Sequence, residues 1–185
     1  MERLYDCGLI VGRFNTFTIG HEHLIDTALK ACDRVLILVG SAQEYGTKKN
    51  PFNIATRLKM LNMVYGDNDR VMIYALPDLT KERTDNNVLW GEYVLKNAKR
   101  YLFKEPDCMI YGLSKDEEGR ATGWFDTDKL ENMNFLLVPR HTIKISATEV
   151  RDLMLNDNRE EWQKWVNPKI HKMYDSLRKE LIQAK

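Results

Sequence analysis

Five short apolar runs alternate with stretches in which apolar residues recur every three or four positions. The runs cover residues 8–11, 35–39, 71–76, 108–111 and 135–138. The segment Leu36-Ile37-Leu38-Val39 is continuously apolar, which is typical of a strand covered on both faces. The intervening stretches place apolar residues on one helical face: Leu24, Ile25, Ala28, Leu29 and Cys32; then Ile54, Leu58, Leu61 and Tyr65; then Leu89, Tyr93 and Leu102. This alternation predicts an α/β protein with a doubly wound, Rossmann-like, five-stranded parallel sheet in the order 3-2-1-4-5.

Beyond the fifth run the pattern becomes wholly helical. Ser146 and Glu149 have the spacing of a capping box, and Pro168 suits the first turn of a last helix. The polar stretch 115–132 has no clear period, so we expect a long loop or lid with a short helix there. A chain of 185 residues fits one domain. We therefore predict a single domain over 1–185, with an α/β core over 1–145 and a helical part over 146–185.

The composition argues against several classes of protein. A formal net charge of +1 gives no global field that would attract nucleic acid or a membrane surface. No apolar run approaches the ~18 residues of a membrane span, and the first residues lack the apolar core of a signal peptide. The cysteines have no CxxC spacing, which favours buried thiols in a reducing compartment. We expect a cytoplasmic protein whose anion sites are built locally.

The most informative motif follows the first apolar run directly. Residues 12–21, GRFNTFTIGH, combine a glycine-punctuated turn with the start of a helix. Backbone N–H groups at a helix start are unpaired and lie at the positive end of the helix dipole, so phosphates bind there. Arg13 adds a charge that binds phosphate oxygens, and Thr18 and His21 add hydrogen-bond donors. Taken alone, His21 also suits the plain start of a helix, and His23 is expected at the surface.

Residues 18–21 (TIGH) and 145–151 (ISATEVR) together resemble the T/HxGH and ISxTxxR motifs of the nucleotidylyltransferase superfamily. The second matches at every fixed position. Thr16 and Thr18 stand where the pyridine-nucleotide branch usually has proline and the first motif histidine. The resemblance implies catalytic roles for Arg13, Thr18, His21 and Arg151. With Gly112 added by analogy with the fold, the expected ATP-binding and phosphate-binding residues are Gly12, Arg13, Phe14, Gly20, His21, Gly112, Ser146, Ala147, Thr148 and Arg151.

A third motif follows the second apolar run. Residues 40–43 (GSAQ) and 50–52 (NPF), followed by Arg57, resemble nicotinamide-mononucleotide (NMN) adenylyltransferases of the archaeal type. The resemblance implies that Ser41 and Gln43 line the site of the acceptor nucleotide and that Arg57 contacts phosphate. Without it, the segment is a polar loop in which Asn53 caps the next helix.

A fourth motif, residues 87–90 (NVLW), follows the third apolar run. The same resemblance implies that Trp90 stacks on the nicotinamide ring while Asn87 meets its carboxamide. A flat indole suits a flat, cationic pyridinium. Taken alone, a tryptophan in an amphipathic helix is more often a core residue, and the other tryptophans, Trp124, Trp162 and Trp165, are expected to pack the interior.

The resemblance as a whole implies adenylyl transfer from ATP to NMN, which gives NAD and pyrophosphate by in-line attack of the acceptor phosphate. Mg²⁺ would be bound through the ATP phosphates, since no cluster of acidic and histidine residues predicts a metal site of the protein's own. A related transferase that uses nicotinate mononucleotide, FMN, phosphopantetheine or an alcohol phosphate is one alternative, because of Thr16 and Thr18. A non-catalytic nucleotide-sensing module is another. The expected partners are ATP and NMN, without nucleic acid or membrane, and the family suggests a homo-oligomer.

Overall fold

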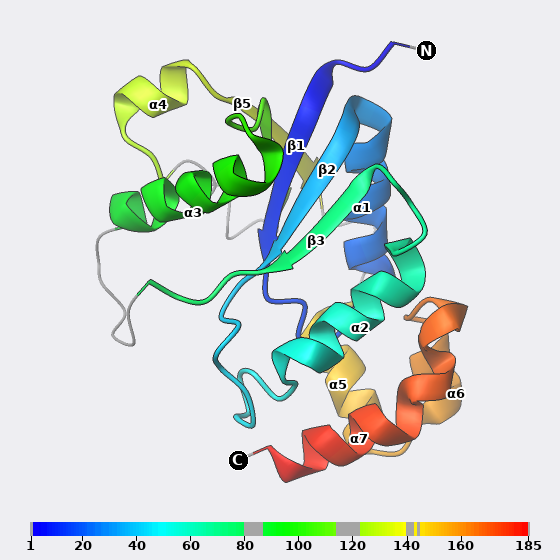
Figure 1. Cartoon of the computed structure of the whole chain (residues 1–185). Coiled ribbons are helices and arrows are strands. Elements are labelled where there is room, and N and C mark those ends of the chain that lie inside the picture. Colours follow the sequence, from blue (N-terminus) through cyan, green and yellow to red (C-terminus); the bar gives the residue numbers. More distant parts are fainter. Residues whose placement is uncertain (1, 80–86, 114–122, 140–142, 144, 185) are drawn as a thin grey trace.

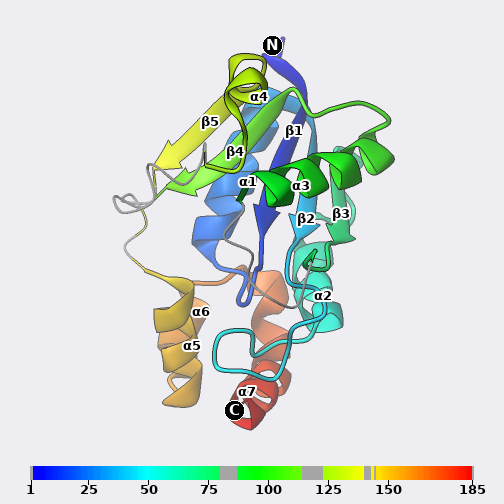
Figure 2. The ribbon, with the colours of Figure 1, turned by 90° about the vertical axis from the view of Figure 1, so that its left-hand side faces the viewer.

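The computed structural model describes residues 2–79, 87–113, 123–139, 143 and 145–184. Its strands form one parallel five-stranded sheet in the order β3-β2-β1-β4-β5 (Figures 1 and 2). They are β1 (Tyr5–Gly12), β2 (Cys32–Val39), β3 (Val71–Ala75), β4 (Cys108–Leu113) and β5 (Asn134–Pro139). Each strand coincides with one of the five apolar runs. The predicted fold class and strand order are therefore confirmed.

Helices cover both faces of the sheet. They are α1 (Ile19–Ala31), α2 (Ile54–Tyr65), α3 (Asn87–Leu102), α4 (Thr127–Glu131), α5 (Ala147–Leu155), α6 (Arg159–Gln163), the 3₁₀ helix η2 (Pro168–Met173) and α7 (Tyr174–Gln183). The predicted last helix starts at Pro168 but is divided between η2 and α7. Of the predicted loop 115–132, residues 115–122 lie outside the described part of the chain, and α4 is its short helix. None of the helices in the described segments is long and apolar enough to cross a membrane.

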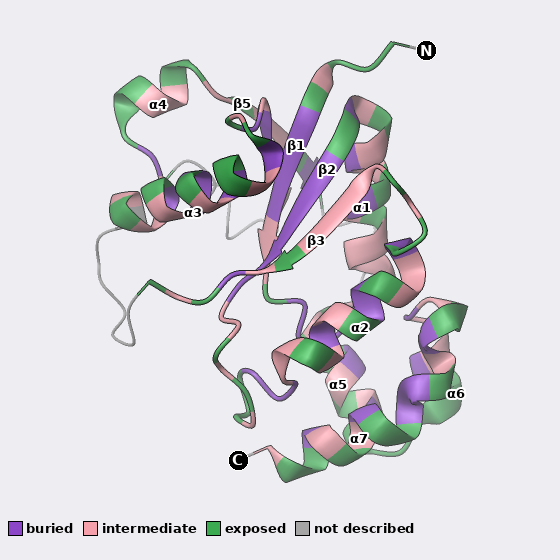
Figure 3. Cartoon of the chain, in the orientation of Figure 1, coloured by how far each residue is buried: buried purple, intermediate pink, exposed green. Residues whose placement is uncertain are grey.

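Two hydrophobic clusters lie on opposite faces of the sheet, and the central strands contribute to both. Ile37 of β2 packs into the cluster formed with α1, α2 and the C-terminal helices, whereas Leu36 and Leu38 pack into the cluster formed with α3. This division explains why the second apolar run is continuous rather than alternating. Figure 3 shows the central part of β1 and most of β2 buried. The three cysteines are buried free thiols, as predicted.

The C-terminal helices lie beyond the carboxyl ends of the strands, on the side of α1 and α2 (Figures 1 and 2). Their largest buried side chains, Trp162 and Tyr174, are 0 % and 2 % exposed and belong to the same hydrophobic cluster as α1 and α2. The first backbone N–H of α1, that of Ile19, donates a hydrogen bond to the carbonyl of Trp165 at 2.9 Å. The C-terminal segment therefore packs as part of the main core and satisfies one of the unpaired donors at the start of α1.

The start of α2 is held from the same side. The side chain of Asn53 accepts the backbone N–H of Thr56 at 2.9 Å, so Asn53 is the predicted N-cap. The carboxylate of Glu180 in α7 accepts the backbone N–H and the amide of Asn53 at 2.7 and 2.8 Å, and the hydroxyl of Thr56 at 2.8 Å. A carboxylate at a helix start is also favourably placed in the helix dipole.

Arg57, in the first turn of α2, joins two loops at the carboxyl edge of the sheet. Its side chain is 0 % exposed. Its guanidinium donates to backbone carbonyls of the turn after β1 and of the loop after β2: those of Arg13 (3.1 Å), Gly40 (2.8 Å), Ser41 (2.9 Å) and Glu44 (3.4 Å). None of these acceptors is a carboxylate. Burial lowers the pKa of this guanidinium, because the charged form has lost its contact with water.

We predict that Arg57→Met lowers the free energy of unfolding by about 2–4 kcal/mol, since buried carbonyls lose their donor. Urea unfolding measures this change. The same substitution at Arg34, whose ion pair with Asp6 is exposed, serves as a control and is expected to change stability by less than about 1 kcal/mol. Equal effects at the two sites would contradict a structural role for Arg57.

A second prediction concerns Gly91 in the middle of α3. A Cβ at this position would collide with the backbone carbonyl of Trp124, which packs against the helix. Gly91→Ala is therefore expected to destabilise the protein by about 1–3 kcal/mol, although alanine is favoured over glycine in an open helix by about 1 kcal/mol. Lys96→Ala, on an exposed position of the same helix, is the control in the same urea titration. A stabilising effect of Gly91→Ala would show that α3 does not pack as closely as described.

Candidate active site

A cavity of about 550 Å³ lies at the carboxyl ends of β1, β4 and β5. Eight of the residues expected to bind ATP or to act in catalysis line it: Gly12, Arg13, Phe14, Thr18, Gly20, His21, Gly112 and Ser146. His23, expected at the surface, is exposed and also lines the cavity. The structure thus brings the segment after β1 and the segment before α5 to the same cavity, although they lie far apart in the sequence.

The first turn of α1 places His21 against this cavity. Thr18 is the N-cap, and its backbone N–H lies 3.2 Å from Nδ1 of His21. The hydroxyl of Thr18 lies 3.0 Å from the same nitrogen. The aromatic rings of Phe14 and Phe17 flank the imidazole, with centroids 5.1 and 6.0 Å away. The hydroxyl of Thr18, which is expected to reach a phosphate, lies against His21 in this structure.

Arg13 and Arg151 are connected through Asn15, which the sequence interpretation did not single out. Arg13 donates to Oδ1 of Asn50 at 3.2 Å, and the amide of Asn15 donates to the same oxygen at 2.7 Å. Arg151 donates to the backbone carbonyl of Asn15 at 3.2 Å. Burial lowers the pKa of Arg151, and the positive charge of Arg13 lowers it further. The positive charges of Arg13 and Arg151 repel one another, so the region between them favours the binding of an anion.

The start of α5 is the second helix terminus at the cavity. The side chain of Ser146 accepts the backbone N–H of Glu149 at 3.2 Å, and the carboxylate of Glu149 accepts the backbone N–H of Ser146 at 2.7 Å. This reciprocal pair is the predicted capping box. Hydrogen bonds from Ser146 lower the pKa of Glu149. Ala147 and Thr148 follow in the first turn, where the Thr148 hydroxyl accepts from Arg151 at 3.0 Å, but neither these two residues nor Arg151 lines the cavity.

The residues expected at the acceptor site do not line this cavity. Ser41 and Gln43 both donate to the carboxylate of Asp78, at 3.2 and 3.1 Å, and the backbone N–H of Asp78 donates back to Gln43 at 2.9 Å. This small network joins the loop after β2 to the segment after β3. Asp78 was not identified from the sequence, because nothing in its neighbourhood distinguishes it from a surface carboxylate.

Arg57, which is expected to contact a phosphate, is occupied by contacts within its own chain in this structure. The guanidinium is fully buried, its two terminal nitrogens donate to carbonyls of its own chain, and Nε is buried without a partner in the described structure. Arg57 therefore joins the two loops beside the cavity.

Trp90 belongs to a group of aromatic rings between α3 and the sheet. Its ring lies 6.1 Å from that of Trp124 at nearly a right angle and 5.6 Å from that of Tyr93. Trp124 also contacts Tyr111 of β4, at 5.8 Å. The hydroxyl of Tyr111 is buried without a hydrogen-bond partner in the described structure, and burial raises its pKa. Trp90 is partly exposed, whereas the side chain of Asn87 lies outside the described part of the structure.

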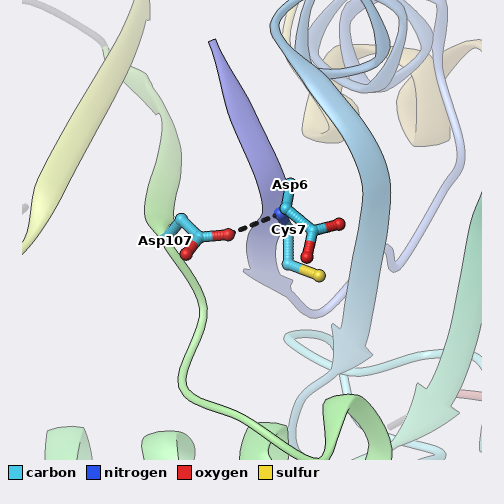
Figure 4. A group of neighbouring side chains, drawn as sticks. All are labelled: Asp6, Cys7 and Asp107. Atoms are coloured by element: carbon cyan, nitrogen blue, oxygen red, sulfur yellow. Dashed lines mark hydrogen bonds between the residues drawn. The ribbon is translucent and has the colours of Figure 1, made fainter. Parts of the chain in front are cut away.

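Among the described residues, one group of side chains has the spacing of metal ligands. It comprises Asp6, Cys7 and Asp107, and Figure 4 shows the backbone N–H of Cys7 donating to Asp107. The ammonium of Lys104 lies 2.9 Å from a carboxylate oxygen of Asp6 and of Asp107. These two carboxylates raise the pKa of Lys104 to about 12, and Lys104 is the largest cause that lowers the pKa of Asp6. The group is therefore a paired ion cluster at the amino end of β1, and it does not contribute to the cavity.

Comparisons with known proteins agree with this geometry. The nicotinamide-nucleotide adenylyltransferase of Saccharolobus solfataricus is 38% identical over 91 residues, which cover 47% of this chain and 50% of that protein. The enzyme of the same name from Archaeoglobus fulgidus is 26% identical over 164 residues, covering 84% of this chain and 83% of that protein. The chain thus spans about half the length of several curated relatives that it matches.

Solved structures share the fold. A bifunctional NMN adenylyltransferase/ADP ribose pyrophosphatase from Francisella tularensis superposes with a TM-score of 0.74 at 22% identity, covering 96% of this chain and 52% of that one. A NadR protein in complex with NAD and AMP-PNP superposes with a TM-score of 0.59 at 19% identity, covering 92% of this chain and 47% of that one. The cytidylyltransferase-like family model matches residues 9–153, which include both helix starts at the cavity. Because this match extends over most of the chain, the protein belongs to the cytidylyltransferase-like family.

Proposed function

We propose that this protein transfers the adenylyl group of ATP to NMN and releases NAD and pyrophosphate. The single observation that carries the proposal is the meeting of two helix starts, those of α1 and α5, at one cavity lined by Arg13, His21 and Ser146. Two positive dipole ends and an arginine at one place suit a triphosphate. The names of the curated relatives support the same activity.

Such a transfer needs alignment and charge stabilisation rather than a protein nucleophile. A phosphate oxygen of NMN attacks the α-phosphorus of ATP, a new P–O bond forms, and the bond to the oxygen that bridges to the β-phosphorus breaks. The electron pair of that bond leaves with pyrophosphate. In this proposal His21 donates a hydrogen bond to the triphosphate, while Arg13 and Arg151 stabilise the negative charge that develops on the leaving group.

A divalent cation, which we propose is Mg²⁺, would be held by the ATP phosphates. Among the described residues that line the cavity, Glu149 offers a carboxylate, and this carboxylate already accepts the N–H of Ser146. A donor set of this kind suits a metal that arrives with its nucleotide, because Mg²⁺ is usually bound through one or two carboxylates and substrate phosphates. Bound there, the metal would neutralise part of the triphosphate charge.

We place the nicotinamide ring of the acceptor beside Trp90. Stacking on an indole suits a pyridinium cation, and Trp124 at a right angle supplies a second apolar wall. Burial raises the pKa of the hydroxyl of Tyr93, the neighbour of Trp90, and the negative charge of Asp78 raises it further. A negative charge near this wall disfavours an acceptor ring that carries its own carboxylate. We therefore favour nicotinamide over nicotinate mononucleotide.

Pyrophosphate release from a matrix of substrates tests this proposal. ATP and CTP are each paired with NMN, nicotinate mononucleotide, FMN, phosphopantetheine and an alcohol phosphate. ATP with NMN is expected to give the highest kcat/KM, with NAD as the product. A tenfold preference for another pair would overturn the assignment. NAD binding by calorimetry without turnover of any pair would instead indicate a nucleotide-sensing module.

We predict that His21→Ala lowers kcat by about 100-fold or more, with a much smaller change in the Kd of ATP. The reason is that its hydrogen bond is proposed to strengthen as charge develops in the transition state. Single-turnover kinetics and calorimetry separate these two quantities. His171→Ala, in η2 and remote from the cavity lining, is the matched control and is expected to leave both nearly unchanged. A Kd that rises as much as kcat falls would mean that His21 serves binding alone.

We further predict that Trp90→Ala raises the KM of NMN about tenfold while the KM of ATP changes less than about twofold, because only the acceptor loses its stacking surface. Trp90→Phe retains an aromatic surface and is expected to recover most of the loss. Thermal unfolding of both variants checks that α3 still packs. An unchanged KM for NMN in the folded alanine variant would show that Trp90 only packs against its neighbours and does not bind the acceptor.

A further inference from the structure

Two groups of Thr18 meet the same ring nitrogen of His21. The backbone N–H lies 3.2 Å from Nδ1, and the hydroxyl oxygen lies 3.0 Å from it. Thr18 is 3 % exposed, so water does not compete strongly for these contacts. With Phe14 and Phe17 beside the ring, the Nδ1 edge and the ring plane of His21 are both held by neighbouring groups.

The chemistry of the backbone donor determines where the imidazole proton lies. A peptide N–H can only donate, so Nδ1 accepts and carries no proton. In a neutral imidazole the proton is then on Nε2, at the opposite edge of the ring. The Thr18 hydroxyl shares the same acceptor, and it therefore also donates to Nδ1.

We propose that Thr18 is a positioning residue that fixes His21 in the Nε2–H tautomer and in one ring orientation. This inference rests on the proposed adenylyl transfer, in which His21 donates to the triphosphate. Thr18 then acts through His21 and does not itself touch the nucleotide. A donor aligned before the substrate arrives avoids reorganisation during the reaction, which is how fixed hydrogen-bond donors lower a barrier.

The tautomer can be observed directly, without turnover. Long-range ¹H–¹⁵N correlation spectra of the wild-type protein, with His21→Ala used to assign the signals, distinguish a protonated from an unprotonated ring nitrogen. We expect His21 to show an unprotonated Nδ1 and a protonated Nε2 in mildly alkaline buffer. A proton on Nδ1 would overturn the proposal.

Three threonine variants test the consequence for catalysis. Thr18→Val keeps the shape but removes the hydroxyl, and is expected to lower kcat about tenfold while the KM of ATP stays within about threefold. Thr18→Ser restores the hydroxyl and is expected to restore most of kcat. Thr27→Val makes the same change later in α1, away from the cavity lining, and controls for helix stability. Wild-type kcat in Thr18→Val would overturn the role of the hydroxyl.

A double-mutant cycle separates positioning from direct contact. In the His21→Ala background there is no ring to hold, so adding Thr18→Val is expected to lower kcat by less than about twofold. A full tenfold loss in that background would show that the hydroxyl acts on the substrate itself and would overturn the proposal. If the wild-type protein formed no NAD from ATP and NMN, the proposed function would fail, whereas the ¹⁵N spectrum would still decide the tautomer.

Discussion

The carboxyl edge of this sheet depends on the burial of one guanidinium. The side chain of Arg57 extends from α2 to the turn after β1 and the loop after β2, and it binds both by their backbone carbonyls. The carbonyls accept from its two terminal nitrogens, while Nε is buried without a partner in the described structure, and none of these contacts cancels the positive charge close to Arg13. The same side chain thus gives the loops their shape and makes their surroundings electropositive, which suits the proposed binding of phosphorylated substrates.

The helical C-terminal part positions the helices from which these side chains extend. Glu180 of α7 holds the start of α2, from which Arg57 extends, and the carbonyl of Trp165 holds the start of α1, which carries His21. The termini of both helices are therefore fixed by a segment that follows the last strand. In this fold the positions of His21 and Arg57 are set from outside the α/β layers, by contacts that span much of the sequence.

Local patterns in the sequence were sufficient to predict the fold, whereas contacts between distant segments were not. Short apolar runs located the five strands of the described residues, and the capping pair Ser146 and Glu149 lies within one helical turn. Nothing local shows whether the donors of Arg57 face a ligand or the chain's own carbonyls, since its acceptors lie 13 to 44 residues away. Asp78 was missed for the same reason, because its partners Ser41 and Gln43 come from another part of the chain. The contact between Thr18 and His21 had a visible signal in the spacing of an N-cap and the third helical residue.

The hydrogen bond from the backbone N–H of Thr18 to Nδ1 of His21 depends on the backbone and not on the side chain at position 18. Every residue except proline supplies a backbone N–H at that position. Replacement of the side chain at position 18 can therefore weaken or strengthen the contacts that orient the imidazole. The backbone hydrogen-bond donor to Nδ1 persists in either case. A substitution at position 18 is therefore expected to change the reaction rate by degrees rather than to remove the alignment of His21 altogether.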